Sequence, residues 1–587
     1  MSQWGAKRWA EWYGWNYQQI LAHYYTGIII QKALTEEIEP PLTSIVFPWS
    51  GFYMNSARAL LMANASDEAS GVLEVDFMAT YGEGTIKPSH FLGSDTNGLD
   101  GWSLVWDLSS VSDQSVEDGI ELRSIAYDGA KNPQYGGGTA IVGLDRSNPD
   151  GIAYSKKTVT STLDVTLTLL ATDNISGEIR VSASNDWLWE GEELFREVVN
   201  GITVGHPISD PDALNGSAMY AEAGVDPAGA WYGPYTFELE PGRAYRAIFR
   251  LKTDNVTTAE EIALLDVVQN AGTELLGIRR IRGIDFREPL TYQEFPVDFY
   301  YWEEGRAGLE FRLTFRGVAD IYLDRILVTS YPSPFENSFR WRLAPGEGQK
   351  LVWVKFFDEA DNVSSDVTLT FTITDVNPPG NWGNFSPSGW AGQTTTVTCT
   401  VQVADDVSGI SPNSALFRYS IDGGNTWSNW LSATMSLSNV LEGLVIASAG
   451  PFTEGLSNRI QFQVADNKGF VSTSPVYTVA LDIVPPTAHI TSPETSLLNA
   501  FTVTWMGSDN LSGIAGYDVQ YCRDGGDWTS WLTATSKTKA LFTGEFGHRY
   551  AFRVRAWDKA GNVGPFSPEG EAVTLVYSRV FLPIILR

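Results

Sequence analysis

Internal repetition constrains the fold of this chain more than any other feature of its sequence. The phrase Asp-x-x-Ser-Gly recurs at 173–177, 405–409 and 509–513. A second phrase, an alternating strand that ends in an Asp turn, recurs as LRSIAYDGAKN, VWVKFFDEADN, IQFQVADNKG and AFRVRAWDKAGN. Because repetition of this kind marks similar supersecondary units along a chain, we predict an array of related modules.

The modules are predicted to be β-sandwiches. Runs such as 57–65, 72–81 and 158–171 alternate apolar with polar residues or are β-branched, and Gly, Asn and Asp turns separate them. Each module has about 100 residues, the size of an immunoglobulin-like sandwich. The modules resemble the immunoglobulin-like and fibronectin-like modules of bacterial surface proteins, although the Cys–Trp–Cys signature of antibody domains is absent.

One module is predicted to contain an insertion. The two repeated phrases lie 61 residues apart in the third module and 49 in the fourth, but 185 in the second, between Asp173 and Asp358. The excess of 124 to 136 residues is enough for a whole domain. An exposed hairpin tip tolerates such an insertion when the ends of the inserted domain lie close together. We therefore predict a guest domain at 190–332, hosted by the second module.

The guest domain carries a further resemblance. The segments MYAEAG, WYGPYTFELEPGRAYRAIFRL and IYLDRILV are similar in order to jelly-roll carbohydrate-binding modules with the galactose-binding-like fold. That resemblance implies glycan binding and a structural Ca²⁺, held by an N-terminal acid and the Asp of the final strand. Asp324 matches the latter position, and Glu192 and Glu222 are candidates for the former. The alternative for Asp324 is an ion pair with Arg325 or with a neighbouring strand.

Clustered aromatic residues in and beside the guest domain are the candidate glycan platform. Flat aromatic faces stack on sugar rings, and neighbouring Arg and Glu side chains suit the hydroxyl groups. In the segment 300–302, adjacent side chains point to opposite faces of a strand, so at least one ring should be exposed. The alternative is that the rings pack in the core or along the sandwich edges. The candidates are Trp187, Trp189, Trp231, Tyr232, Tyr235, Tyr300, Tyr301 and Trp302.

The first residues are predicted to be helical and resemble the end of another domain. MSQWGA, followed by YxxILxHYYTG, is similar to the end of the SpoIID family, which includes stage II sporulation protein D and the LytB amidase enhancer. Those proteins remodel peptidoglycan. Ser2, Gln3 and His23 match positions near the family's glycan groove, but its catalytic glutamate lies upstream of this motif. We therefore expect a longer secreted parent, with a transglycosylase or amidase-enhancer region before residue 1. The alternative is a true start with a helical cap.

Charge and residue counts exclude several function classes. The chain has 40 Lys and Arg and 70 Asp and Glu, so its net charge is −30. This charge disfavours nucleic acid and anionic membrane surfaces as partners. No run of 18 apolar residues predicts a membrane-spanning helix. Cys399 and Cys522 lie in different modules, so we expect no disulfide. The five His show no metal spacing and no Gly-x-Ser-x-Gly elbow occurs, so we assign no catalytic residue.

Two shorter features have two interpretations each. The repeated Asp turns could hold Ca²⁺ between modules, but Asx turns, in which the aspartate caps its own backbone, explain them more simply. The apolar tail YSRVFLPIILR resembles C-terminal tails of secreted proteins from filamentous Chloroflexi-type bacteria. It is either a sorting or docking strand, or a last strand of the fourth module.

The expected fold class is mainly β. Tandem immunoglobulin-like sandwiches carry an inserted jelly-roll sandwich and a short N-terminal helical segment. The predicted divisions are a helical stub (1–38), a first module (40–147), a split second module (148–189 and 333–376), the guest domain (190–332), third and fourth modules (378–484 and 485–577) and a tail (578–587).

We expect a monomeric, extracellular or cell-envelope-associated binding and spacer protein that binds glycan or peptidoglycan through the guest domain. Two alternatives stay open. One is a structural surface adhesin that binds no glycan. The other is a polysaccharide-active enzyme that uses the jelly roll, and carboxylates facing each other across a cleft would favour it.

Overall fold

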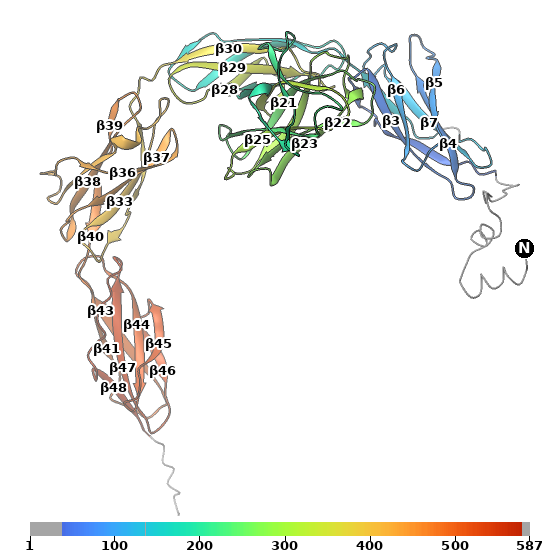
Figure 1. Ribbon diagram of the computed structural model, residues 1–587. Helices are drawn as coiled ribbons and strands as arrows, with labels where there is room; N and C mark the ends of the chain where they lie inside the picture. The colour runs from blue at the N-terminus through green and yellow to red at the C-terminus, as the bar shows by residue number, and fades with distance from the viewer. Residues whose placement is uncertain (1–37, 135–136, 578–587) are drawn as a thin grey trace, which may run out of the picture. The chain divides into compact units, whose positions relative to one another are not determined.

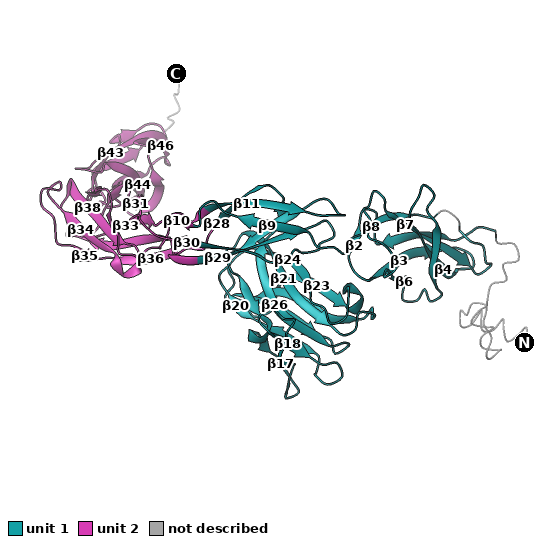
Figure 2. Ribbon diagram, turned by 90° about the horizontal axis from the view of Figure 1, so that it is seen from above, with its two compact units in different colours: residues 1–158, 165–341, 350–371 teal, residues 159–164, 342–349, 372–587 magenta. Residues whose placement is uncertain are grey.

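The computed structural model describes residues 38–134 and 137–577. Within these ranges nearly all of the regular secondary structure is β-strand and none is α-helix, which confirms the mainly β fold class (Figure 1). The predicted N-terminal helices and the C-terminal tail lie outside the described residues. The chain divides into two compact units (Figure 2). Unit 1 consists of 1–158, 165–341 and 350–371, and unit 2 of 159–164, 342–349 and 372–587.

The first module, in unit 1, is a sandwich of two sheets whose strands come in a distinctive order. One sheet has the order β1 (Leu42–Phe47), β3 (Arg58–Ser66), β6 (Trp102–Asp107). The other has the order β2 (Tyr53–Met54), β8 (Ala140–Leu144), β7 (Ile120–Asp128), β4 (Val72–Thr80), β5 (Ser89–Asp95). Among the named strands of this module, β2 and β8 pair in parallel and the other pairs are antiparallel. Leu61, Phe77 and Leu122 are fully buried between the sheets.

The second module repeats this order with strands drawn from two distant segments. One sheet is β9 (Asp150–Tyr154), β11 (Asp164–Thr172), β28 (Ser338–Arg342). The other is β10 (Val159–Thr160), β30 (Val367–Ile373), β29 (Gly348–Phe357), β12 (Arg180–Ser184), β27 (Ser333–Pro334). Val181 of β12 pairs with Ser333 of β27, so the chain leaves this module and returns to it at neighbouring positions.

The strands between β12 and β27 pair only among themselves, and we call them the inserted sandwich (β13–β26); they form two large sheets and a small hairpin of β15 (Val198–Val199) with β16 (Ile202–Thr203). One sheet is β17 (His206–Ser209), β18 (Ser217–Ala221), β26 (Ile321–Ser330), β21 (Arg243–Thr253), β24 (Gln293–Tyr301), with β13 (Leu188–Glu190) beside β26. The other is β14 (Phe195–Arg196), β19 (Gly229–Tyr232), β25 (Leu309–Phe315), β22 (Glu261–Gln269), β23 (Glu274–Arg282), with β20 (Pro234–Thr236) beside β25.

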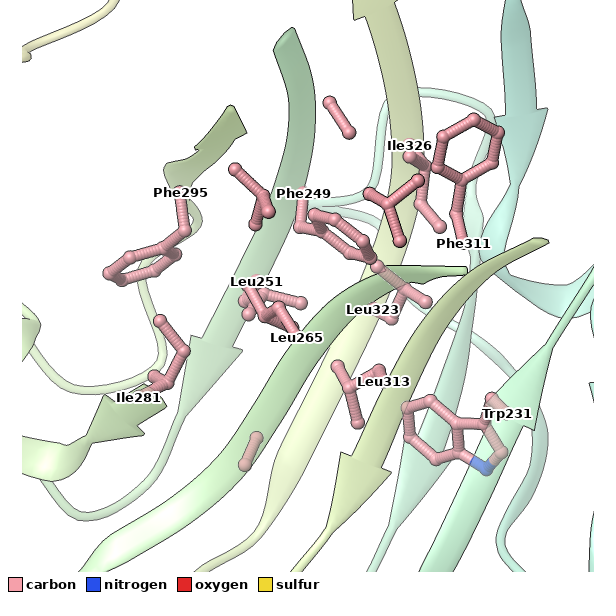
Figure 3. Close-up of a cluster of buried hydrophobic side chains, with 14 of the residues drawn as sticks. Trp231, Phe249, Leu251, Leu265, Ile281, Phe295, Phe311, Leu313, Leu323 and Ile326 are labelled. Atoms are coloured by element: carbon pink, nitrogen blue, oxygen red, sulfur yellow. The ribbon is translucent and has the colours of Figure 1, made fainter. Parts of the chain in front are cut away.

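The inserted sandwich has a dense aromatic and aliphatic core of its own. Phe249, Leu265 and Phe311 are fully buried in it (Figure 3). The long strands β21 and β22 supply much of this core, because apolar residues dominate their inward faces. A separate core is the property that defines a domain. The predicted limits of this and the other domains stay predictions.

Unit 2 holds the third and fourth modules. The third has sheets β31 (Gly380–Ser386), β33 (Val397–Ala404), β37 (Glu442–Ala449), β36 (Thr434–Asn439) and β32 (Trp390–Ala391), β40 (Tyr477–Leu481), β38 (Gly455–Ala465), β34 (Leu416–Ser420), β35 (Leu431–Ser432). The fourth has sheets β41 (Thr487–Thr491), β43 (Ala500–Ser508), β46 (Lys539–Thr543) and β42 (Thr495–Ser496), β48 (Ala572–Val576), β47 (Arg549–Asp558), β44 (Ile514–Arg523), β45 (Thr529–Thr535).

All four modules therefore share one strand order, that of immunoglobulin-like and fibronectin-like sandwiches, and the third module adds one edge strand, β36. The local cause is alternation: in β33, Val397, Cys399, Val401 and Val403 face inward and the residues between them are polar. Cys399 and Cys522 are both free and buried, as expected from their positions in separate cores. No helix among the described residues has the length and apolar character needed to cross a membrane.

Candidate ligand-binding surface of the inserted sandwich

Four of the eight predicted platform residues belong to the core. Trp231 lies among the buried core side chains (Figure 3), and Tyr301 is also fully buried. The indole nitrogen of Trp231 donates a hydrogen bond to the Val204 carbonyl at 3.0 Å. Trp187 and Trp189 are half-buried and pack against the same core. Trp189 stacks on Phe311 with ring centroids 5.1 Å apart. The packing alternative describes these four rings, because they lie in the core of the inserted sandwich or pack against it.

Tyr300 and Trp302 lie on the surface and form an open aromatic pair. Tyr300 is 37% exposed and Trp302 69% exposed, and their ring centroids are 4.1 Å apart at an interplanar angle of 46°. They stand two residues apart at the end of β24, an edge strand of its sheet. Strand alternation explains why the intervening Tyr301 points into the core while its neighbours face outward.

The polar surroundings of this pair come from the turn that precedes β21. The Tyr300 hydroxyl donates to the Gly242 carbonyl at 2.9 Å, which fixes the ring against that turn. Next to Gly242, Arg243 pairs with Glu240 at 2.8 Å, and both side chains are largely exposed. A flat apolar face therefore lies beside a charged donor and a charged acceptor.

A second aromatic group lies on the other sheet. Tyr232 and Tyr235 are half-buried around Phe195, which is 54% exposed. The ring centroid of Phe195 lies 5.8 Å from that of Tyr232 and 5.9 Å from that of Tyr235. Sequence analysis missed Phe195, because only the pairing of β14 with β19 places it opposite Tyr232.

The three predicted calcium ligands do not converge. Asp324 is completely buried, but it forms an ion pair with Arg250 of the neighbouring strand β21, and its other oxygen accepts from the Leu214 amide at 3.2 Å. Burial raises the pKa of Asp324, and Arg250 opposes that rise. Glu222 is exposed at the end of β18. Glu192 accepts from Asn215 at 2.7 Å through one oxygen, and its other oxygen is buried.

Ca²⁺ requires several free oxygens around one point. No convergent acidic triplet in the described part of the chain includes Asp324, Glu192 or Glu222. The predicted alternative for Asp324, an ion pair with a neighbouring strand, accounts for its burial, while Arg325 pairs with Asp366 instead. These three residues therefore do not fit a shared calcium ion.

Glu190, on β13, is a strongly perturbed acid of this region. Burial is the main cause, and the negative charges of Asp324 and Glu192 add to it, so the pKa of Glu190 rises to about 7. Arg325 opposes the rise without cancelling it. Glu190 therefore holds a proton more readily in the folded chain than an exposed glutamate does.

A polar cavity of about 430 Å³ lies within unit 1, where the inserted sandwich meets the second module. Lys355 reaches Glu294 and Asp366, each at 2.9 Å, so these two carboxylates of the wall are already paired. The Arg250 guanidinium lies over the Tyr292 ring, 4.3 Å from its centroid. Hydrolysis needs two carboxylates facing a substrate, and the paired state of Glu294 and Asp366 gives the enzyme alternative no support.

Comparisons with known proteins concern the fold alone. No family model matches the chain, and no curated protein matches it. Among solved structures, the fibronectin(III)-like modules of CbhA from Clostridium thermocellum match at 16% identity over 33% of this chain and 93% of that chain, with a TM-score of 0.20. The FN1–FN3 domains of chicken CNTN1 match at 11% identity over 55% of this chain and 99% of that chain, with a TM-score of 0.24.

A tetra-tandem repeat from the extending region of a large adhesion protein matches at 12% identity over 91% of this chain and 98% of that chain, with a TM-score of 0.16. The assignment of the modules follows from their strand order and pairing. That assignment makes the chain a tandem array of immunoglobulin-like and fibronectin-like modules.

Proposed function

We propose that the inserted sandwich binds an extracellular glycan at the surface of Tyr300 and Trp302, and that the tandem modules act as its spacer. The observation that carries this proposal is Trp302, which is 69% exposed and tilted against a Tyr300 ring that is itself fixed. A large apolar ring left this open at a sheet edge costs solubility and gains nothing in the core.

The chemistry of the surface suits a sugar ring. A pyranose presents a flat face of C–H groups, which can stack on an aromatic ring, and a rim of hydroxyl groups that both donate and accept hydrogen bonds. The Arg243–Glu240 pair beside Tyr300 supplies one group of each kind. Ligand sites of this type combine an apolar platform with a few polar groups that fix orientation.

Peptidoglycan is the favoured glycan, since the first residues resemble the end of the SpoIID family. In this proposal the chain is extracellular or associated with the cell envelope, and its acidic surface keeps it soluble. The jelly-roll resemblance of the segments 219–224 and 321–328 supports the same ligand class.

Binding of the full chain to insoluble peptidoglycan and to a glycan array tests the proposal. We expect Trp302→Ala to weaken binding at least about tenfold, which corresponds to about 1.4 kcal/mol. Phe91→Ala is the matched control, because Phe91 is a 60% exposed ring on the edge strand β5 of another module. Phe195→Ala tests the second aromatic group. Equal binding by the wild type and Trp302→Ala, or no binding to any glycan, would refute the proposal.

A further inference from the structure

Nine aspartates form three triplets at equivalent places in the second, third and fourth modules. Within each triplet, one carboxylate oxygen from every residue lies within 4.8 Å of the others. The triplets are Asp145, Asp173 and Asp358; Asp375, Asp405 and Asp466; and Asp482, Asp509 and Asp558. The first triplet lies in unit 1 and the other two in unit 2.

The three members of each triplet have fixed positions relative to the strands. The first follows the last strand of one module, as Asp482 follows β40. The second opens the turn after the second long strand of the next module, as Asp509 follows β43. The third ends the strand that carries the other repeated phrase, as Asp558 ends β47. The repeated sequence phrases thus supply two ligand positions, and the preceding module supplies the third.

In the central aspartate of each triplet, the Asx turn uses only one of the two carboxylate oxygens. Asp405 Oδ2 accepts from the Val407 and Gly409 amides at 3.1 and 2.7 Å, as an Asx turn requires. Asp405 Oδ1 is buried and has no hydrogen-bond donor among the described residues. Asp173 and Asp509 repeat the arrangement, with Oδ2 on backbone amides and Oδ1 buried without a donor. The Asx-turn interpretation is therefore correct but incomplete.

Other members also direct free oxygens into the triplets. Asp466 is 2% exposed and Asp145 is fully buried, and in each the Oδ2 atom has no donor within the described ranges. A buried carboxylate oxygen without a partner is costly, and three negative charges close together add to the cost. Something positively charged should occupy each triplet.

We propose that each triplet binds one Ca²⁺ ion. The ligands are oxygens only, which is what a hard cation prefers over nitrogen or sulfur. Two oxygens bound to one Ca²⁺ at about 2.3–2.6 Å lie at most about 5 Å apart, and the spacing within the triplets meets that limit. The Asx turns hold the carboxylates in place before the ion arrives, so binding needs little reorganisation.

The consequence of the proposal is a cation-dependent link from each module to the next. Asp375 and Asp482 stand three residues before Pro378-Pro379 and Pro485-Pro486. An ion held by Asp482 together with Asp509 and Asp558 ties this stiff connection to the body of the fourth module. The Asn562 side chain already donates to the Asp482 carbonyl at 2.7 Å, and Asn362 donates to the Asp145 carbonyl at 3.0 Å. This inference is independent of glycan binding.

The first module carries two of the three positions within the described residues. It carries the same phrase at 67–71, which sequence analysis overlooked, and Asp67 Oδ2 caps Ala69 and Gly71 in the same way. Asp128 occupies the strand-end position and accepts from Asn132 through both oxygens. No acidic triplet forms there among residues 38–134 and 137–577.

Calcium binding by the full chain tests the proposal directly. The chain is stripped with a chelator and titrated with CaCl₂ by calorimetry up to about 1 mM, since extracellular modules bind Ca²⁺ at about 10⁻⁴–10⁻³ M. We expect Asp173→Asn, Asp405→Asn and Asp509→Asn each to remove one bound ion, and the triple variant to remove three. Asparagine keeps an oxygen for the turn amides while it removes the free anionic oxygen.

A turn-capping aspartate outside the triplets is the control. Asp422, in the third module, accepts from the Thr426 amide at 2.9 Å and lies on the surface. Asp422→Asn should leave the number of bound ions unchanged. Hydrogen exchange of the wild type gives a second measurement, because Ca²⁺ should slow exchange of the amides at 407–409 and 511–513. No binding at 1 mM Ca²⁺, or three ions retained by the triple variant, would overturn the proposal.

Discussion

Lys355 is a buried charge that joins the inserted sandwich to the second module. Its side chain is 1% exposed, and its ammonium group contacts Glu294 of β24 and Asp366, each at 2.9 Å. It also donates to the Ser364 carbonyl at 2.8 Å. Burial alone would raise the pKa of Asp366, but Lys355 and Arg325 bring it below its ordinary value, so this carboxylate is charged at neutral pH.

Replacing Lys355 with methionine removes the charge and keeps most of the volume. Breaking a buried ion pair on one side costs about 3–5 kcal/mol, because the partner is left charged and buried. The lower end applies here, since Asp366 keeps Arg325 and Glu294 is 16% exposed. We therefore predict that Lys355→Met lowers the local free energy of unfolding by about 3 kcal/mol, a factor of about 150 in the opening equilibrium.

Native-state hydrogen exchange is the suitable assay, because a chain of several modules does not unfold in two states. Exchange of the β24 and β29 amides should accelerate about 150-fold in Lys355→Met. Lys468→Met is the control: Lys468 pairs with Glu347 at 2.7 Å, but the pair is solvent-exposed, and exposed pairs contribute little. Acceleration below about fivefold in β24, about 1 kcal/mol, would refute the view that Lys355 is essential to this interface.

Two further substitutions test the inserted sandwich. Because the pKa of Glu190 is raised to about 7, the folded chain binds more protons than the unfolded chain between about pH 4.5 and 7, so stability falls as pH rises through that range. Glu190→Gln should remove this pH dependence and stabilise β13 by about 1–2 kcal/mol at pH 8, after allowance for solvent screening. Hydrogen exchange of the β13 amides as a function of pH measures this, and an unchanged pH profile would contradict the prediction. Trp231→Phe should cost about 2–3 kcal/mol through the lost bond to Val204 and the space left behind, yet leave glycan affinity per folded molecule unchanged. A loss of affinity without a loss of stability would show that Trp231 contacts ligand.

Sequence spacing predicted much of the fold because the modules repeat one strand order. Periodicity alone predicts the alternation of β33, and it places Cys399 in a core. The 185-residue interval between Asp173 and Asp358 pointed to extra chain in the second module, and the strands between β12 and β27 pair only among themselves. These features are local or repeated, so they can be recognised in a single sequence without knowledge of the strand pairing.

The candidate site was harder to predict, since it depends on strand pairing. The order Tyr300-Tyr301-Trp302 predicts alternation but not which ring faces outward; the pairing register of β24 with β21 decides that. Asp324 faces Arg250 because a bulge at Arg250 and Leu251 shifts the pairing of β21 with β26. Phe195 joins Tyr232 only through β14. None of these pairings joins residues at a constant separation along the chain, so the sequence pattern alone could not predict them.

Acidic residues of this chain lie both on the surface and in the buried aspartate triplets. A charge of −30 explains solubility only if the charges face solvent. Seven of the nine triplet aspartates are buried, so they contribute little to surface repulsion and instead repel one another inside each cluster. Three divalent ions would bring the charge from −30 to −24 and remove most of that internal repulsion. Composition alone cannot tell surface charges from buried ones. The recurrence of aspartates at the same strand ends identifies the buried ones, because the structure brings each pair of them together with an aspartate from the end of the preceding module.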